Sequence, residues 1–324
     1  MMTERKINFY IASCVPDGGV YSCELAEDGS VDLKMVVSAP SPMWIEWAGD
    51  NELWVLMRDP FEENRNSGVA KYGLSGGDRI GDILSTEGEV ACHLAVDGEE
   101  LYAANYISGS VWSSKTGVDK HSGRGADPVR QEAPHVHSVF FSPDKRYILS
   151  CDLGLDKIFV YDREMKLVST ADTPAGTGAR HIVFSKDGKY VYCLNEMGAT
   201  VSIFTYDNGS LGYIRDVDVK PHGYTDKGKG SAIKISRDGK RIYVTERGSE
   251  TITLFEVNGE TLTPVSVVSS HGTEPRDFSL VGGERFAICT NQFGNNLSVY
   301  RVEDNGGLTF LRNVPIPAPL CVLE

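Results

Sequence analysis

Side chains capable of proton transfer and anion binding stand at the two ends of residues 180–196, RHIVFSKDGKYVYCLNE, with apolar runs between them. Arg180 and His181 open this stretch, and Asn195 and Glu196 close it. A histidine or a carboxylate can accept or donate a proton, and a guanidinium can stabilise an anion. The Asp-Gly pair in the middle is typical of a hairpin turn between two strands. If the stretch folds as a hairpin, its polar ends lie side by side and could form one site.

Stretches of the same pattern recur along the chain at intervals of about 40–50 residues, a period that belongs to propellers and solenoids. Clear copies begin at His137, Arg180, Ser231 and Arg276, and weaker copies begin at Cys92 and Met43. Each copy contains an alternating run, a turn, a run rich in β-branched and aromatic residues, then a third run and a more polar fourth run. Four short antiparallel strands per repeat predict the blade of a propeller.

Seven such blades account for residues 1–324 as one domain, so the predicted fold is an all-β, seven-bladed propeller of four-stranded antiparallel blades. The first repeat, from Ile7 to Ser38, supplies only second, third and fourth strands. The chain ends in the apolar run Pro319–Leu323, which we expect to complete that blade as its innermost strand. Closing the ring removes the exposed strand edges of a linear array. The charged stretch 115–133 is the least strand-like, and we expect a long loop there in place of the third blade's outer strand.

The strand order of a blade brings the polar ends of all repeats to one rim. The connection into a first strand and the turn after a second strand lie on the same face, and the Asp-Gly turns lie on the opposite face. The first-strand entrances carry His93, His135, His137, Arg180, His181, Ser231 and Arg276. The second-strand exits carry Asn105, Tyr106, Asp152, Asn195, Glu196, Glu246, Arg247, Asn291 and Gln292. Convergent polar groups at the channel mouth predict a binding site there.

Several of these residues also have a purely structural interpretation. Asn105, Asn195 and Asn291 occupy the same blade position, so each could brace a turn through its side-chain amide. Asp152 could be a turn residue, and His181 could be a hydrogen-bonded core histidine.

Three arginines near the channel mouth, Arg180, Arg247 and Arg276, are harder to explain in this way. Guanidinium groups in a narrow opening repel one another unless anions neutralise them. Glu196 and Glu246 could do this as structural ion pairs. The alternative is an anionic ligand.

The overall composition limits the class of partner. The formal net charge of −13 argues against nucleic acid or an anionic membrane as the main partner. Residues 1–19 lack the apolar core of a signal peptide, and no apolar run approaches the about 18 residues of a membrane span. The seven cysteines are scattered, without a CxxC pair, and most lie in apolar runs. We therefore expect buried free thiols without a metal role, in a protein of the reducing cytoplasm.

The repeats HSVFFSPDKRYILSCDLGLDKIFVYD, ARHIVFSKDGKYVYCLNEMGATVSIFTYD and EPRDFSLVGGERFAICTNQFGNNLSVY resemble those of the seven-bladed lactonase family. That family contains the propeller-type 6-phosphogluconolactonases of bacteria and the fungal 3-carboxy-cis,cis-muconate lactonising enzyme. The resemblance implies a site without metal or cofactor, whose catalytic residues are His137, Arg180, Glu196 and Arg247. The second blade departs from the family pattern, because MRDP (Met57–Pro60) replaces the usual Asn-Glu.

The resemblance also implies hydrolysis of a sugar lactone, with 6-phosphoglucono-1,5-lactone as the first candidate substrate. In that reaction Glu196 could activate water and His137 could protonate the leaving ring oxygen, although these proton roles could be exchanged. Arg180 and Arg247 could hold the oxyanion or the anionic group of the substrate. The other polar residues expected to bind substrate are His93, Asn105, Tyr106, Asp152, His181, Asn195, Arg276, Asn291 and Gln292.

Other functions remain open at this point. A lactonising cycloisomerase would use the same histidine and glutamate to move a carbon-bound proton, and another sugar-acid lactonase would differ only in substrate. A non-catalytic propeller would serve as a binding platform. A calcium-dependent lactonase would use carboxylates such as Asp152 and Glu196, but the nearby arginines oppose a divalent cation. The expected partner is an anionic small molecule, bound by a monomer or a weak homo-oligomer.

Overall fold

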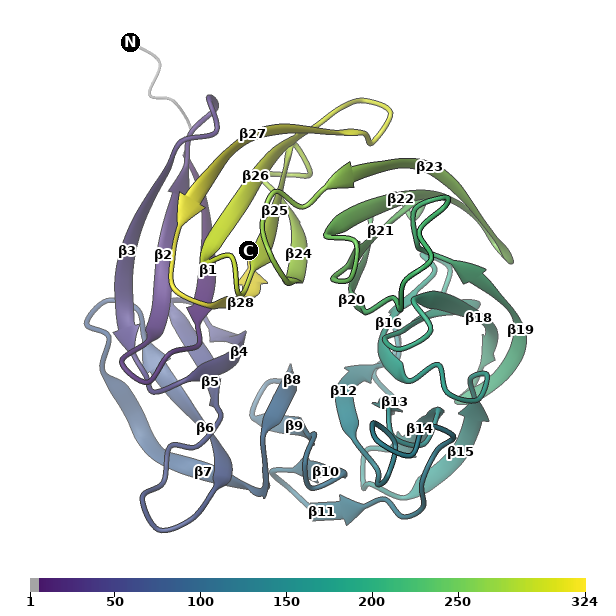
Figure 1. The fold of residues 1–324 in the computed structure, drawn as a ribbon. Helices are drawn as coiled ribbons and strands as arrows, with labels where there is room; N and C mark the ends of the chain where they lie inside the picture. The colour runs from purple at the N-terminus through teal and green to yellow at the C-terminus, as the bar shows by residue number, and fades with distance from the viewer. Residues whose placement is uncertain (1–5) are drawn as a thin grey trace.

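The structure, a computed structural model, describes residues 6–324, which form seven four-stranded antiparallel sheets around a central channel (Figure 1). The sheets are the blades of a propeller, and the described residues contain no helix. Consecutive innermost strands contact one another around the complete ring. The predicted all-β, seven-bladed architecture is confirmed.

From the channel outward, blade one contains β28 (Pro319–Leu323), β1 (Ile7–Ser13), β2 (Gly19–Leu25) and β3 (Val31–Ser38). Blade two contains β4 (Pro42–Gly49), β5 (Glu52–Met57), β6 (Asn66–Gly73) and β7 (Arg79–Glu89). Blade three contains β8 (Ala91–Asp97), β9 (Glu100–Asn105), β10 (Ser110–Ser113) and β11 (Gly117–Lys120). Blade four contains β12 (Val136–Phe141), β13 (Tyr147–Asp152), β14 (Lys157–Asp162) and β15 (Leu167–Asp172).

Blade five contains β16 (Ala179–Phe184), β17 (Tyr190–Asn195), β18 (Thr200–Asp207) and β19 (Ser210–Asp218). Blade six contains β20 (Gly230–Ile235), β21 (Arg241–Glu246), β22 (Thr251–Asn258) and β23 (Thr261–Ser269). Blade seven contains β24 (Pro275–Val281), β25 (Phe286–Asn291), β26 (Asn296–Val302) and β27 (Leu308–Pro315).

The C-terminal strand closes the ring, as the sequence predicts. β28 lies inside β1 and pairs with it antiparallel, with Tyr10 opposite Leu323 and Ala12 opposite Cys321. Blade one therefore takes its innermost strand from the far end of the chain, and no blade of the described chain is left with three strands.

The inner hairpin of each blade brings the two predicted polar ends together. In blade five, Ala179 pairs with Asn195, so Arg180 and Glu196 stand beside each other at the same rim. The equivalent pairs are Ala91 with Asn105, Val136 with Asp152, Gly230 with Glu246, and Pro275 with Asn291. The two polar ends of these hairpins therefore lie at one rim, as predicted, and the Asp187-Gly188 turn lies at the other end of its hairpin.

One irregularity recurs near the start of every innermost strand. The pairing register shifts so that one extra residue stands on the inner strand, which defines a β-bulge. The extra residues are Leu320, Met43, Cys92, His137, Arg180 and Arg276, and in blade six the extra residue falls within Ser231–Ala232. A bulge twists the strand locally and turns a side chain to a new direction. The same bulge therefore turns one side chain per blade toward the channel mouth.

The expectation for residues 115–133 is partly wrong. Blade three does have an outer strand, β11, although it has only four residues, Gly117–Lys120, and pairs with β10. The connection to blade four begins after this strand, at His121, and runs to His135.

Apolar clusters fill the spaces between neighbouring blades. One cluster joins blades one and seven around Phe9, Phe286 and Val299. Six of the cysteines are buried and Cys14 is partly buried, and all seven are free thiols, as the sequence predicts. Among residues 6–324, no helix is long and apolar enough to cross a membrane.

Candidate functional site

The bulge residues form the deeper layer of a site at the channel mouth. Six of them line a cavity of about 20 Å³, together with Trp44 and His181. Such a cavity has room for about one water molecule. Its apolar bulge residues, Leu320, Met43 and Cys92, come from blades one to three. Its polar ones, His137, Arg180 and Arg276, come from blades four, five and seven, so the ring has an apolar half and a polar half.

A larger pocket of about 330 Å³ adjoins this cavity and shares Met43, Cys92, His137 and Arg276 with it. The residue directly after the second strand of a blade supplies four more lining side chains, Arg58, Tyr106, Glu196 and Arg247. Two equivalent positions in successive blades, the bulge and the strand exit, thus build most of the site.

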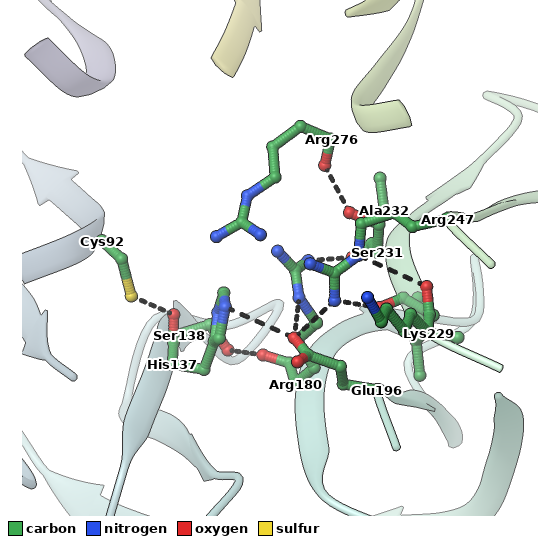
Figure 2. A network of polar contacts seen from close by, with 12 residues as sticks. Cys92, His137, Ser138, Arg180, Glu196, Lys229, Ser231, Ala232, Arg247 and Arg276 are labelled. Atoms are coloured by element: carbon green, nitrogen blue, oxygen red, sulfur yellow. Dashed lines mark hydrogen bonds and ion pairs between the residues drawn. The ribbon is translucent and has the colours of Figure 1, made fainter. Parts of the chain in front are cut away.

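Glu196 lies at the centre of the polar half (Figure 2). Its Oε2 lies 3.1 Å from Nε of Arg180 and 2.8 Å from Nη2 of Arg247. Its Oε1 accepts a hydrogen bond of 2.6 Å from Nη2 of Arg130. Nε2 of His137 lies 4.0 Å from Oε2. One carboxylate is therefore shared by three guanidinium groups, with an imidazole beside it.

The charges around Glu196 and His137 fix their protonation in the same way. Burial by itself would raise the pKa of Glu196, but Arg247 and Arg180 outweigh it and hold that pKa well below its usual range. Burial and the charge of Arg180 hold the pKa of His137 well below its usual range, although Glu196 opposes the shift. At neutral pH the site thus contains a carboxylate and an uncharged imidazole.

Arg180 is the most enclosed of the guanidinium groups. The residue is 2% exposed, and besides Glu196 it donates to the carbonyl oxygen of Ser231. Burial lowers its pKa, and the charges of Arg276 and Arg247 add to this shift. The repulsion between arginines that the sequence indicates is therefore present, and Glu196 is the carboxylate that opposes it.

The three asparagines predicted to bind substrate do not line either cavity. Each is fully buried, and its side-chain amide donates to a serine hydroxyl of the third strand. These bonds are 3.1 Å from Asn105 to Ser110, 2.7 Å from Asn195 to Ser202 and 2.8 Å from Asn291 to Ser298. Their position corrects the binding prediction and agrees with the structural interpretation, because the side chains are used inside their own blades.

Asp152 is also displaced from the site by its contacts. Its carboxylate lies 2.6 Å from Nδ1 of His121 and accepts hydrogen bonds from the backbone N–H groups of His135 and Leu155. Asp152 therefore holds the connection before blade four and does not line the pocket, which corrects its predicted role.

The remaining predicted residues fall into two groups, those that line a cavity and those that do not. Tyr106 and Arg276 line the larger pocket, and His181 lines the small cavity. His93 lies outside both linings and packs between Trp44 and Phe140 in tilted contacts, with ring centroids 4.1 and 4.5 Å away. Gln292 follows β25 at the rim but does not line the pocket, which again corrects the prediction.

Sequence reasoning missed three cations of the larger pocket, Arg58, Arg130 and Lys229. Arg58 lies in the MRDP segment that departs from the family pattern, so a signal was present for it. Arg130 comes from the connection between blades three and four. Its neighbour Gln131 is fully buried and fixes this connection by donating to the carbonyl oxygen of Leu153 and to Asp156.

The larger pocket is strongly cationic in a chain of net charge −13. One carboxylate, that of Glu196, lines it. The five cationic side chains of the lining are Arg58, Arg130, Lys229, Arg247 and Arg276. Within residues 6–324, no group of three or more His, Cys, Asp or Glu side chains is placed to hold a metal ion. The arrangement suits a small anion.

Comparison with known proteins matches this chain to a family. The family described as "Lactonase, 7-bladed beta-propeller" matches residues 8–324. The 6-phosphogluconolactonase of Bacillus subtilis is 31% identical over 332 aligned residues, which cover 94% of this chain and 93% of that protein.

Solved structures agree with the fold. A protein from Lactobacillus plantarum superimposes with a TM-score of 0.90 at 26% identity, covering 98% of this chain and 99% of that one. The periplasmic gluconolactonase of Pseudomonas aeruginosa superimposes with a TM-score of 0.84 at 26% identity, covering 98% of each chain. The chain belongs to the seven-bladed β-propeller lactonase family.

Proposed function

We propose that this protein hydrolyses a phosphorylated sugar lactone, with 6-phosphoglucono-1,5-lactone as the first candidate substrate. The observation that carries the proposal is the site around Glu196, where an uncharged His137 and the guanidinium of Arg247 line a cationic pocket and Arg180 lines the small cavity beside it. The name of the Bacillus subtilis relative supports the choice of substrate. An anionic small molecule is accordingly the proposed partner.

His137 is the proposed general base. Its Nδ1 is buried without a hydrogen-bond partner among residues 6–324. Its Nε2 lies 4.0 Å from the carboxylate of Glu196, and we assign proton transfer to this nitrogen, because His137 lines the larger pocket. Water attacks the lactone carbonyl carbon while Nε2 takes one of its protons. The resulting imidazolium is stabilised by the charge of Glu196 at 4.0 Å.

Arginines stabilise the charge that forms on the substrate. In the tetrahedral intermediate the former carbonyl oxygen carries a negative charge, which Arg180 and Arg247 are placed to offset. The bond between the carbonyl carbon and the ring oxygen then breaks, and the imidazolium of His137 returns its proton to that oxygen. The products are the open-chain sugar acid and unprotonated His137, so atoms and protons balance.

The test compares consumption of freshly prepared 6-phosphogluconolactone with its spontaneous hydrolysis. We expect acceleration by the wild type that a chelator leaves unchanged, and loss of that acceleration in Glu196→Gln and Arg180→Ala variants that keep the β-sheet circular dichroism of the wild type. Full activity in either folded variant contradicts the site. Absence of acceleration in the wild type favours a cycloisomerase or a binding protein, and loss with chelator favours a calcium-dependent lactonase.

A further inference from the structure

Two guanidinium groups of the larger pocket have no carboxylate partner among residues 6–324. Arg130, Arg180 and Arg247 all pair with Glu196, and Arg247 also pairs with Glu274 at 2.8 Å. Within the described chain, neither Arg58 nor Arg276 has a carboxylate oxygen within 4.0 Å. The positive charges of these two side chains are therefore not offset by direct ion pairs.

Arg58 is fixed in place but poorly neutralised. Its backbone N–H donates to the carbonyl oxygen of Ser41 at 3.1 Å, and its own carbonyl oxygen accepts a 2.5 Å bond from the hydroxyl of the buried Ser67. Its buried Nε has no hydrogen-bond partner among residues 6–324. Its Nη2 lies 3.4 Å from the sulfur of Met43, which is only a weak acceptor. A buried donor left without a partner is costly, so the Arg58 guanidinium favours binding of a hydrogen-bond acceptor from a ligand.

Arg276 is aimed at the channel mouth by the bulge of blade seven. Its carbonyl oxygen accepts a 2.8 Å bond from the hydroxyl of Ser231, which ties the bulge to blade six. Figure 2 shows its guanidinium pointing into the site without a contact to Glu196. Its main chain is thus held by the protein while the charged group remains available.

Both charges act on the same part of the pocket. Burial raises the pKa of the Cys14 and Cys92 thiols, and in both cases Arg58 and Arg276 oppose that rise. Cys14 and Arg58 belong to blades one and two, and Glu196 belongs to blade five (Figure 1). Arg276 acts on both sides of the pocket, because its charge also lowers the pKa of Glu196 and of His137. The pocket therefore has a reactive side at Glu196 and a cationic side at Arg58, and the charge of Arg276 reaches both.

We propose that Arg58 and Arg276 form the subsite for the phosphate of the substrate, and that Arg58 is a specificity-determining residue. This inference rests on the proposed function, because it supposes a lactone carbonyl beside Glu196. A phosphate monoester carries up to two negative charges and accepts bidentate hydrogen bonds from guanidinium groups. A sugar lactone phosphorylated at its far end would span the pocket with its carbonyl at His137 and its phosphate at Arg58.

The experiment compares ligands that differ only in phosphate. Values of kcat/KM are measured for 6-phosphogluconolactone and gluconolactone, and dissociation constants are measured by calorimetry for 6-phosphogluconate and gluconate. The proteins are the wild type, Arg58→Gln, Arg58→Lys, Arg276→Gln and the control Arg65→Gln. Arg65 lies in the same connection after β5 but is 80% exposed and outside the pocket lining.

We expect the wild type to prefer the phosphorylated member of each pair. In Arg58→Gln the ratio of phosphorylated to unphosphorylated kcat/KM falls by about 10- to 100-fold, and the preference for 6-phosphogluconate falls similarly. Arg276→Gln shows the same selective loss, Arg58→Lys keeps part of the preference, and Arg65→Gln behaves as wild type. Equal losses on both ligands, or an unchanged preference, in Arg58→Gln overturn the inference.

The binding measurement distinguishes a failure of the phosphate subsite from a failure of the proposed hydrolysis. If the wild type accelerates neither lactone, the proposed function fails, while selective binding of 6-phosphogluconate and its loss in Arg58→Gln still support the phosphate subsite. If the wild type hydrolyses both lactones equally and binds both acids equally, hydrolysis stands and the subsite is overturned.

Discussion

At the scale of single residues, the most informative contact is the sharing of Glu196 by three guanidinium groups. A carboxylate with this much positive charge around it binds a proton weakly, so it is a poor general base near neutral pH. The pKa of His137 is lowered too, by burial and by Arg180, but an imidazole starts from a higher pKa than a carboxylate and is uncharged here. We therefore assign both proton transfers to His137 and leave Glu196 the role of stabilising the imidazolium.

This assignment predicts the direction of the pH dependence. Because the pKa of His137 is lowered below its usual value near 6.5, its active uncharged form persists to acidic pH. We expect kcat/KM to be constant through neutrality and to fall only as the pH drops below that value. The measurement is a pH–rate profile, corrected for spontaneous hydrolysis, together with the imidazole titration followed by NMR.

Removal of the imidazole tests the same role directly. His137→Gln is expected to lower kcat by about 100-fold or more, the usual contribution of a general acid–base group. The control His222→Gln changes an exposed histidine of the connection before blade six and is expected to retain wild-type activity. An unchanged kcat in His137→Gln, or an activity that declines already above pH 7 on acidification, would remove His137 from the mechanism.

At the scale of elements, the last residue of each second strand has a different task from the residue that follows it. Asn105, Asn195 and Asn291 brace the third strand from a buried position, while Tyr106 and Glu196, one residue later, face the pocket. Neighbouring residues thus have different roles: the asparagine stabilises the blade, and the residue after it lines the pocket. Sequence pattern alone could not divide these pairs, because both members are polar and adjacent.

The structural task of these asparagines predicts a stability effect without a binding effect. Asn291→Ala removes amide bonds of 3.2 Å to the carbonyl oxygen of Ser270 and 2.8 Å to the hydroxyl of Ser298. We expect the free energy of unfolding to fall by about 1–3 kcal/mol, measured by denaturant titration, with KM within about twofold of wild type. The control Asn258→Ala changes an exposed asparagine and should alter neither quantity. A raised KM with unchanged stability would restore the binding role.

The inner hairpins could be predicted from the sequence, whereas β11 and the position of Arg130 could not. The hairpins were predictable because each repeats the same apolar alternation and turn, and their topology brings His137, Arg180, Glu196 and Arg247 to one rim. β11 was missed because its four residues carry almost no strand signal. Arg130 was missed because its position depends on Gln131 contacting Leu153 and Asp156, partners 22 and 25 residues away that no local pattern reveals.

At the scale of the whole molecule, the site exists only because the ring is closed. The lining of the two cavities draws on all seven blades, from Leu320 of blade one to Arg276 of blade seven. Each blade contributes one or a few side chains, and their distances are set by the packing of neighbouring blades. Opening the ring at any point would therefore separate groups that no single blade holds together.

The closing strand β28 is the element on which this arrangement depends most directly. Its three central residues enter three different clusters between blades, since Val322 packs in the cluster of blades one and seven, and Cys321 and Leu320 pack in two others. Burial of one large apolar side chain contributes about 1.5–3 kcal/mol. Loss of the strand would thus remove a large part of a typical native stability of about 5–15 kcal/mol, and would also expose the edge of β1.

Deletion of residues 319–324 is therefore expected to abolish cooperative unfolding or to leave an aggregated protein, rather than a slightly less stable propeller. Thermal melting followed by circular dichroism, together with light scattering, measures this outcome. Deletion of Glu324 alone keeps all of β28 and serves as the matched control, with a much smaller change in Tm expected. A truncated chain that stays monomeric, unfolds cooperatively near the wild-type Tm and retains lactonase activity would show that the blades hold the site without closure.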